Sequence, residues 1–273
     1  MLHRLTGSMR CLPDFLVIGA QKSGTTSLAD YLGRNPGVWF APCKECNHFS
    51  GPQRPANAYR GFFPTRRRRR IMEERHGGPI LLGEGTPYDL FHPRAAEAAF
   101  GLLPDARLLI LLRNPIDRAH SHYRHCVRLG LETLSFEEAL AAEGTRLEGE
   151  EERLRRDPRA VSDYHRHYSY VARGLYARQL ERWLKWYPRE QVQVTISEAL
   201  FGNPEPALAR IEEFLRLAPG DAGGLRQLNR GTVEEPFPDR IREGLRSVYR
   251  EENRRLAEML EVRLPWDDEG EHT

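Results

Sequence analysis

The sequence lacks any run of about 18 apolar residues, which is the length that a helix needs to cross a lipid bilayer. Residues 1–13 carry two arginines but no apolar stretch of the kind that secretory signals contain. Only four of the 273 residues are cysteines, too few for a scaffold held together by disulfides. These absences predict a protein that folds around a hydrophobic core, has no membrane partner and is cytoplasmic.

A large excess of one charge is also missing, since 41 basic residues face 39 acidic ones and the net charge is +2. The five arginines at Arg66–Arg70 are the one strong basic run. A run of this kind is usually a solvated face, and polyanion binding is the alternative. No aromatic residues interleave with it, as single-strand binding would require. We therefore expect no nucleic-acid partner, while a contact with an anionic substrate stays open.

Two of the cysteines, Cys43 and Cys46, form a C-x-x-C pair with His48 close by. Zinc sites usually show a second such pair or further histidines at set spacing. We therefore expect no bound metal, and we interpret the pair as two ordinary thiols.

The most informative residues are 15–27, in which an apolar run ends in small and hydroxyl side chains around Lys22. An apolar strand, a Gly-rich turn and a helix N-terminus together form an anion site, because free N–H groups and the helix dipole point at the bound charge. We expect the site to bind a phosphate-like group through the residues of this turn: Gln21, Lys22, Ser23, Gly24, Thr25 and Thr26.

The turn differs from the standard P-loop, because its lysine precedes the second glycine instead of following it. A nucleoside triphosphatase also needs an aspartate after a neighbouring strand to hold magnesium. The best neighbouring strand, Arg107–Leu112, ends in Arg113 instead. The site is therefore predicted to be cationic and free of metal. A P-loop kinase or other phosphotransferase is the alternative function.

Apolar strands alternate with helical patterns along the whole chain, which predicts an α/β fold. We expect a P-loop-like central parallel sheet with helices on both faces, in a single domain over residues 1–273. Residues 144–169 are polar and show no core periodicity, so we interpret them as a mobile lid. The expected strands are 15–20, 38–41, 80–82, 107–112 and 192–196, and the expected helices are 25–34, 54–78, 92–101, 115–129, 171–186, 204–217 and 238–262, with a capping box at Ser135 and Glu138 before another helix.

Two segments, Lys22–Ser27 and Leu111–His125, resemble the sulfotransferase family, in particular the heparan-sulfate branch and its bacterial relatives. The resemblance implies a bacterial enzyme that moves a sulfuryl group from 3′-phosphoadenosine-5′-phosphosulfate (PAPS) to a hydroxyl or amine. The first segment would hold the 5′-phosphosulfate. Arg113 and Ser121, which match the spacing of the family's second motif, would hold the 3′-phosphate.

The resemblance extends to Tyr176, which follows the pattern of the family's Gly-x-Tyr helix. Many relatives close a Lys-Gly-Arg loop over the 3′-phosphate, and this chain has only Arg230 within Asn229–Thr232 for that role. A second departure is Gly85, where relatives often carry a lysine before Ser/Thr-Pro. Arg94 or Lys44 could supply the missing cation.

The chemistry that the resemblance implies is an in-line transfer, in which positioning and electrostatics do most of the work. Lys22 would balance the charge that grows on the leaving phosphate. Glu45, after Lys44, matches the family's catalytic glutamate, and His48 is the competing base because histidine titrates near neutral pH. The acceptor is predicted to be a small molecule or a glycan, and the sequence does not fix the oligomeric state.

Overall fold

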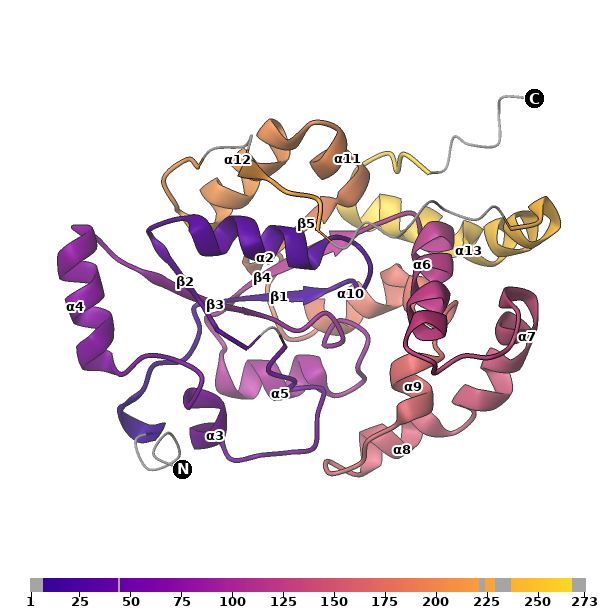
Figure 1. Ribbon diagram of the computed structural model, residues 1–273, viewed down its shortest axis with the longest axis horizontal. Helices are drawn as coiled ribbons and strands as arrows, with labels where there is room; N and C mark the ends of the chain where they lie inside the picture. Colours follow the sequence, from indigo (N-terminus) through magenta and orange to yellow (C-terminus); the bar gives the residue numbers. More distant parts are fainter. Residues whose placement is uncertain (1–6, 44, 221–223, 229–236, 267–273) are drawn as a thin grey trace.

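The computed structural model of this chain describes residues 7–43, 45–220, 224–228 and 237–266 (Figure 1). Within them, five strands form one parallel sheet in the order β2-β3-β1-β4-β5. The expected α/β fold with a central parallel sheet is thereby confirmed. The strands are β1 (Phe15–Gly19), β2 (Val38–Phe40), β3 (Leu81–Gly85), β4 (Arg107–Leu112) and β5 (Val192–Ile196).

Both faces of the sheet are covered because side chains of a strand alternate between its two faces and the central strands are apolar on each. Phe15 and Val17 of β1 pack with helices α2 (Thr25–Arg34) and α12 (Pro204–Leu215). Leu16 and Ile18 face the opposite core, which also contains residues of α5 (Ala95–Leu102), α10 (Tyr176–Leu184) and α13 (Asp239–Leu260). The sheet is therefore the middle of three layers.

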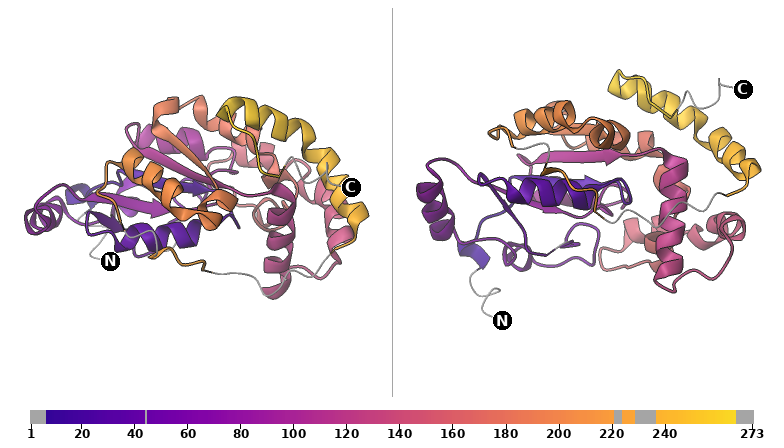
Figure 2. Two further views of the ribbon diagram at one scale, coloured as in Figure 1. Left: turned by 90° about the horizontal axis from the view of Figure 1, so that it is seen from above. Right: turned by 45° about the horizontal axis from the view of Figure 1, so that its top comes forward.

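A second group of helices lies beyond the carboxyl ends of the strands, as Figures 1 and 2 show. The group contains α6 (Pro115–Arg128), α7 (Phe136–Leu147), α8 (Glu150–Arg156) and α9 (Asp163–His167). The capping box at the start of α7 is present as expected, with Ser135 and Glu138 bonded reciprocally. Residues 144–169, expected to lack core contacts, contain α8 and α9 and bury Leu154 and His165. Whether they move stays a prediction.

Other boundaries differ from the expectation in ways that local chemistry explains. The helix expected over 54–78 is two helices, α3 (Ala56–Arg60) and α4 (Arg66–His76), because Gly61 and Pro64 interrupt it. A 3₁₀ turn, η2 (Ala172–Gly174), precedes α10, and α11 (Ser197–Gly202) follows β5 directly. The remaining short elements are η1 (Gly7–Met9) and η3 (Arg189–Gln191).

The four arginines Arg66, Arg67, Arg68 and Arg70 are exposed on α4. Arg69 is half-buried and forms ion pairs with Asp14 and Glu73. Among the helices that the structure describes, none combines the length and the apolar character required to cross a membrane.

Candidate functional site

The loop between β1 and α2 forms a tight cradle. Lys22 has φ +72° and Gly24 has φ +89°, so the backbone turns twice through the left-handed region. A side chain at Gly24 would also place its Cβ 2.6 Å from the ring of Phe201, so only glycine fits. The Ala20 N–H donates to the Leu111 carbonyl at 2.6 Å, which ties the loop to the end of β4. The first N–H groups of α2 follow directly and favour an anion.

Arg113 leaves the sheet at the same edge as the Lys22 loop, because β1 and β4 are neighbours and Gly19 pairs with Ile110. Asn114 caps α6, and its side chain accepts from the Ile116 N–H at 3.0 Å. The Asn114 N–H donates to the Glu198 carboxylate at 2.8 Å. The backbone that follows β4 is therefore held both by the Asn114 cap of α6 and by Glu198. Ser121 lies half-buried further along α6.

The structure thus places the Lys22 loop and Arg113, two parts of the expected cofactor site, at adjacent strand ends. Tyr176 is fully buried, and its hydroxyl donates to the Arg113 carbonyl at 2.9 Å, so it holds the backbone of the site. Arg230 lies outside the described residues. Leu228, two positions earlier, donates its N–H to the Ser27 hydroxyl at 2.8 Å, so the chain approaches α2 just before Arg230.

The segment after β2 carries the two candidate bases. Cys43 and Cys46 form a disulfide, which corrects the interpretation of two ordinary thiols and encloses Glu45 in a four-residue loop. Glu45 is exposed, and Lys44 lies outside the described residues. His48 stacks on Tyr59 with 4.4 Å between ring centroids. Burial, and then the charge of Arg54, lowers the pKa of His48 to about 4, so its imidazole is neutral at pH 7.

The end of β3 supports this segment through Glu84, which the sequence did not single out. The Glu84 carboxylate accepts from Thr86 at 3.0 Å and from Tyr59 at 3.3 Å, and it also bonds the backbone of Cys46. The Asn47 N–H donates to the Thr86 hydroxyl at 3.3 Å. Burial raises the pKa of Glu84 to about 7. The position of Glu84, just after the expected strand 80–82 and before Thr86-Pro87, was the sequence feature that could have identified it.

Two arginines join the 144–169 region to the segment after β2 and to the loop between β1 and α2. The sequence analysis did not identify either of them. Arg166 donates to the Asn47 side chain at 2.7 Å, beside Glu45. Arg173, just after the region, is buried and donates to the Gln21 side chain and to the Arg166 carbonyl. Arg166 lies in the polar segment 144–169 and Arg173 lies within the expected helix 171–186, and no sequence signal at either position marked an arginine that joins two segments.

The missing lysine at Gly85 is not replaced by Arg94 in the described structure. The Arg94 guanidinium donates to the carbonyls of Leu154 and Pro158, at 2.5 Å and 3.1 Å, and so holds α8. Across the parts of the chain that the structure describes, no group of three or more His, Cys, Asp or Glu side chains could hold a metal ion.

Comparison with known proteins gives consistent matches. The family model described as the sulfotransferase domain matches residues 92–230. A crystal structure of a sulfotransferase from Alicyclobacillus acidocaldarius is 33% identical, with a TM-score of 0.69, over 93% of this chain and 98% of that one. A mouse sulfotransferase complexed with PAP shares the fold at 16% identity, with a TM-score of 0.50, over 93% of this chain and 88% of that one.

Among curated proteins, a membrane-associated sulfotransferase of Dictyostelium discoideum is 24% identical over 96% of this chain and 68% of its own length. The bifunctional heparan sulfate N-deacetylase/N-sulfotransferase of Drosophila melanogaster is 28% identical over 76% of this chain. This chain spans only 20% of the length of that relative. These matches do not favour the phosphotransferase alternative.

Proposed function

Because this chain belongs to the sulfotransferase family and its reaction is sulfuryl transfer, we propose that its donor is PAPS and its acceptor a hydroxyl or amine of a small molecule or glycan. The observation that carries the proposal is the meeting of the Lys22 loop and Arg113 at adjacent strand ends. The bound PAP of the mouse neighbour supports the donor, and the heparan sulfate activity in the Drosophila relative's name supports a glycan acceptor.

In this proposal the 5′-phosphosulfate occupies the loop of residues 20–26, where the helix N-terminus and Lys22 complement its charge. Arg113 and Ser121 take the 3′-phosphate, and Arg230 is the third residue proposed to bind it. During transfer the bond between sulfur and the bridging oxygen breaks, and its electron pair stays on the phosphate. The ammonium group of Lys22 then gains attraction in the transition state, which lowers the barrier.

The acceptor must lose its proton as the new bond to sulfur forms. Glu45 is our first choice for the base, on its match to the family's glutamate, and its exposure leaves it open to an entering acceptor. His48 is the second choice, since its imidazole is neutral at pH 7 but its pKa of about 4 makes it a weaker base than an ordinary histidine. Glu84 and Thr86 act as positioning residues, because they hold the backbone of Cys46 and Asn47.

Calorimetric titration with PAP, the desulfated product, tests the proposal. We expect binding that does not depend on magnesium and that weakens about tenfold or more in Arg113→Ala, since a charge-assisted bond to phosphate is lost. Arg128→Ala, at the exposed end of α6, is the matched control and should bind like the unmodified protein. Absence of PAP binding, with magnesium-dependent binding of ATP in its place, would overturn the proposed donor.

A further inference from the structure

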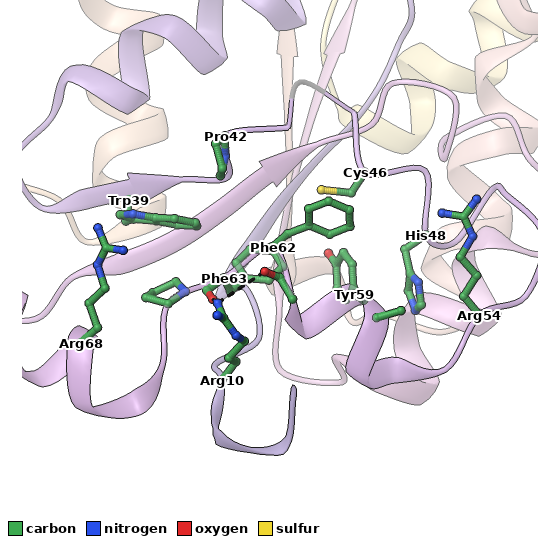
Figure 3. Close-up of a pocket in the computed structure, with 13 residues that line it drawn as sticks. Arg10, Trp39, Pro42, Cys46, His48, Arg54, Tyr59, Phe62, Phe63 and Arg68 are labelled. Atoms are coloured by element: carbon green, nitrogen blue, oxygen red, sulfur yellow. Dashed lines mark hydrogen bonds between the residues drawn. The ribbon is translucent and has the colours of Figure 1, made fainter. Parts of the chain in front are cut away.

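A cavity of about 490 Å³ lies beside the Cys43–Cys46 loop (Figure 3). Trp39 of β2 forms one wall, and Tyr59 of α3 forms another. Cys46 and His48 also line it, so the cavity shares its boundary with the segment that carries the candidate bases. Its volume falls in the range of about 300–1,000 Å³ that is typical of small-molecule sites.

Aromatic rings dominate the walls of this cavity. Trp39 and Phe63 approach with ring centroids 5.9 Å apart, and His48 and Tyr59 are stacked. Phe62 points into the same space in Figure 3. Faces and edges of this kind favour a planar ring, which packs against them in offset or edge-on geometry.

The charged groups that line the cavity are all cationic. They are Arg10, Arg54 and Arg68, and no carboxylate is found among its described lining residues. Arg10 is held in place by its bond to the Phe63 carbonyl at 2.6 Å. Figure 3 shows Arg68 at the Trp39 end and Arg54 at the His48 end. An anionic group at the Arg10–Arg68 end would find charge-assisted donors there.

The polar side chains of the lining favour an aromatic anion over a sugar, because they are mainly donors. A sugar ring carries several hydroxyls, and each one buried without a hydrogen-bond partner costs free energy. The described lining contains no Ser, Thr, Asn, Gln, Asp or Glu side chain that would pair with them. A planar ring with one anionic substituent makes no such demand.

We infer that this cavity binds the acceptor, and that the acceptor is an aromatic carboxylate with a phenolic hydroxyl; the inference rests on the proposed function. The carboxylate lies toward Arg10 and Arg68, and the hydroxyl lies toward the Cys46–His48 end of the cavity, next to the segment that carries Glu45. In the reaction the phenolic oxygen forms a bond to sulfur, its proton passes to the base, and PAP leaves with the electron pair of the broken bond. The products are an aryl sulfate and PAP.

The probe for this inference is 6-hydroxy-2-naphthoate, titrated into the full chain by calorimetry. We expect binding that weakens about tenfold in Arg68→Ala, through the loss of a charge-assisted contact. Arg67→Ala is the matched control, because Arg67 is exposed on the same helix and does not line the cavity. PAP affinity should be unchanged in both variants, which shows that each is folded. With PAPS present, mass spectrometry should detect the sulfated naphthoate.

Analogues sharpen the result. 2-Naphthol, which lacks the carboxylate, should bind about tenfold more weakly, and cellobiose should not bind. The inference is overturned if the naphthoate does not bind, if Arg68→Ala and Arg67→Ala behave alike, or if it binds beside PAP and is never sulfated. Binding of the naphthoate without any binding of PAP would instead overturn the proposed donor and leave the ligand class of the cavity standing.

Discussion

At the scale of single residues, Lys22 must both adopt an unusual backbone conformation and supply a positive charge. Its φ of +72° is unusual for a residue with a side chain and is kept by the surrounding loop. The Ser23 N–H closes the turn on the Ala20 carbonyl at 3.2 Å. The loop therefore presents one cation beside the first N–H groups of α2, where a leaving phosphate would need it.

Replacing Lys22 with alanine should lower kcat by roughly 10²–10³-fold, the size typical of losing one group that stabilises transition-state charge. Initial-rate measurements of sulfated product under saturating PAPS check this. Lys185→Ala is the control, because Lys185 is exposed at the end of α10. A Lys22→Ala enzyme with unchanged kcat would exclude Lys22 from the chemical step.

The choice between the two bases is also a residue-scale question. Glu45→Gln should reduce kcat about 10²-fold or more, whereas His48→Gln should cost less than about tenfold. A base at His48, with its pKa lowered to about 4, would keep the rate independent of this group from pH 8 down to about 5. A pH–rate profile of each variant decides the matter, and a larger loss in His48→Gln would reverse the assignment.

At the scale of elements, residues 144–169 are held against the site by arginines. Arg166 bonds Asn47 and lies over the ring of Tyr88, 5.4 Å from its centroid. Arg173 donates to the Ser169 hydroxyl at 2.8 Å and also reaches Gln21. The α8–α9 region is thereby linked to Asn47 directly through Arg166 and to the Lys22 loop through Arg173, so its position is coupled to both.

Removing the first of these contacts should loosen the region. In Arg166→Ala we expect faster hydrogen exchange over residues 150–168 and over Glu45–Asn47, because a charge-assisted bond of about 1.5–3 kcal/mol is lost. Arg156→Ala is the matched control, since Arg156 is exposed at the end of α8 and pairs with Glu152, which is exposed too. Exchange confined to the mutated position would show that Arg166 does not link the two segments.

At the scale of the whole molecule, the parallel sheet gathers candidate groups from four strands at their carboxyl ends. The Lys22 loop follows β1, and the segment with Glu45 and His48 follows β2. Glu84 lies at the end of β3, next to its last residue, and Arg113 follows β4. The buried carboxylates Glu84 and Asp89 lie within this arrangement, and burial together with their mutual repulsion raises the pKa of Asp89. Their burial makes global stability depend on pH.

The cytoplasmic location stays a proposal that cell fractionation would test.

For Glu84 the sign follows from linkage. Its pKa rises from 4.5 to about 7 on folding, so the folded state holds the proton more tightly. The contribution of Glu84 to the free energy of unfolding is full below pH 4.5 and is lost as the pH rises through about 7. The loss amounts to about 3 kcal/mol. Glu84→Gln should therefore gain stability relative to the unmodified protein between pH 5 and pH 8.

Urea unfolding at those two values measures the change. Glu97→Gln, on the exposed side of α5, should show no such pH-dependent difference. An equal difference between Glu84→Gln and the unmodified protein at both pH values would show that Glu84 is ionised throughout in the folded state.

The sequence by itself determined the local features of this protein. Apolar runs bounded by turn residues specified the strands, and the order of Gly24, Lys22 and the hydroxyl residues specified an anion loop before α2. These signals depend only on neighbours along the chain. Arg113 was predicted from the resemblance of Leu111–His125 to the family's second motif, and Pro115 fits the first turn of the helix that follows β4.

Only the tertiary structure decided how distant segments meet. The strand order brought Arg113 beside the Lys22 loop, and it placed Glu84 under Cys46 and Asn47. The burial of Arg173 and the arginine-lined aromatic cavity depend on residues far apart in the chain, and no local period records such contacts. The anion loop lies in one segment and could thus be predicted from the sequence. A site built from several strand ends depends on the order of the strands in the sheet, which only the tertiary structure gives.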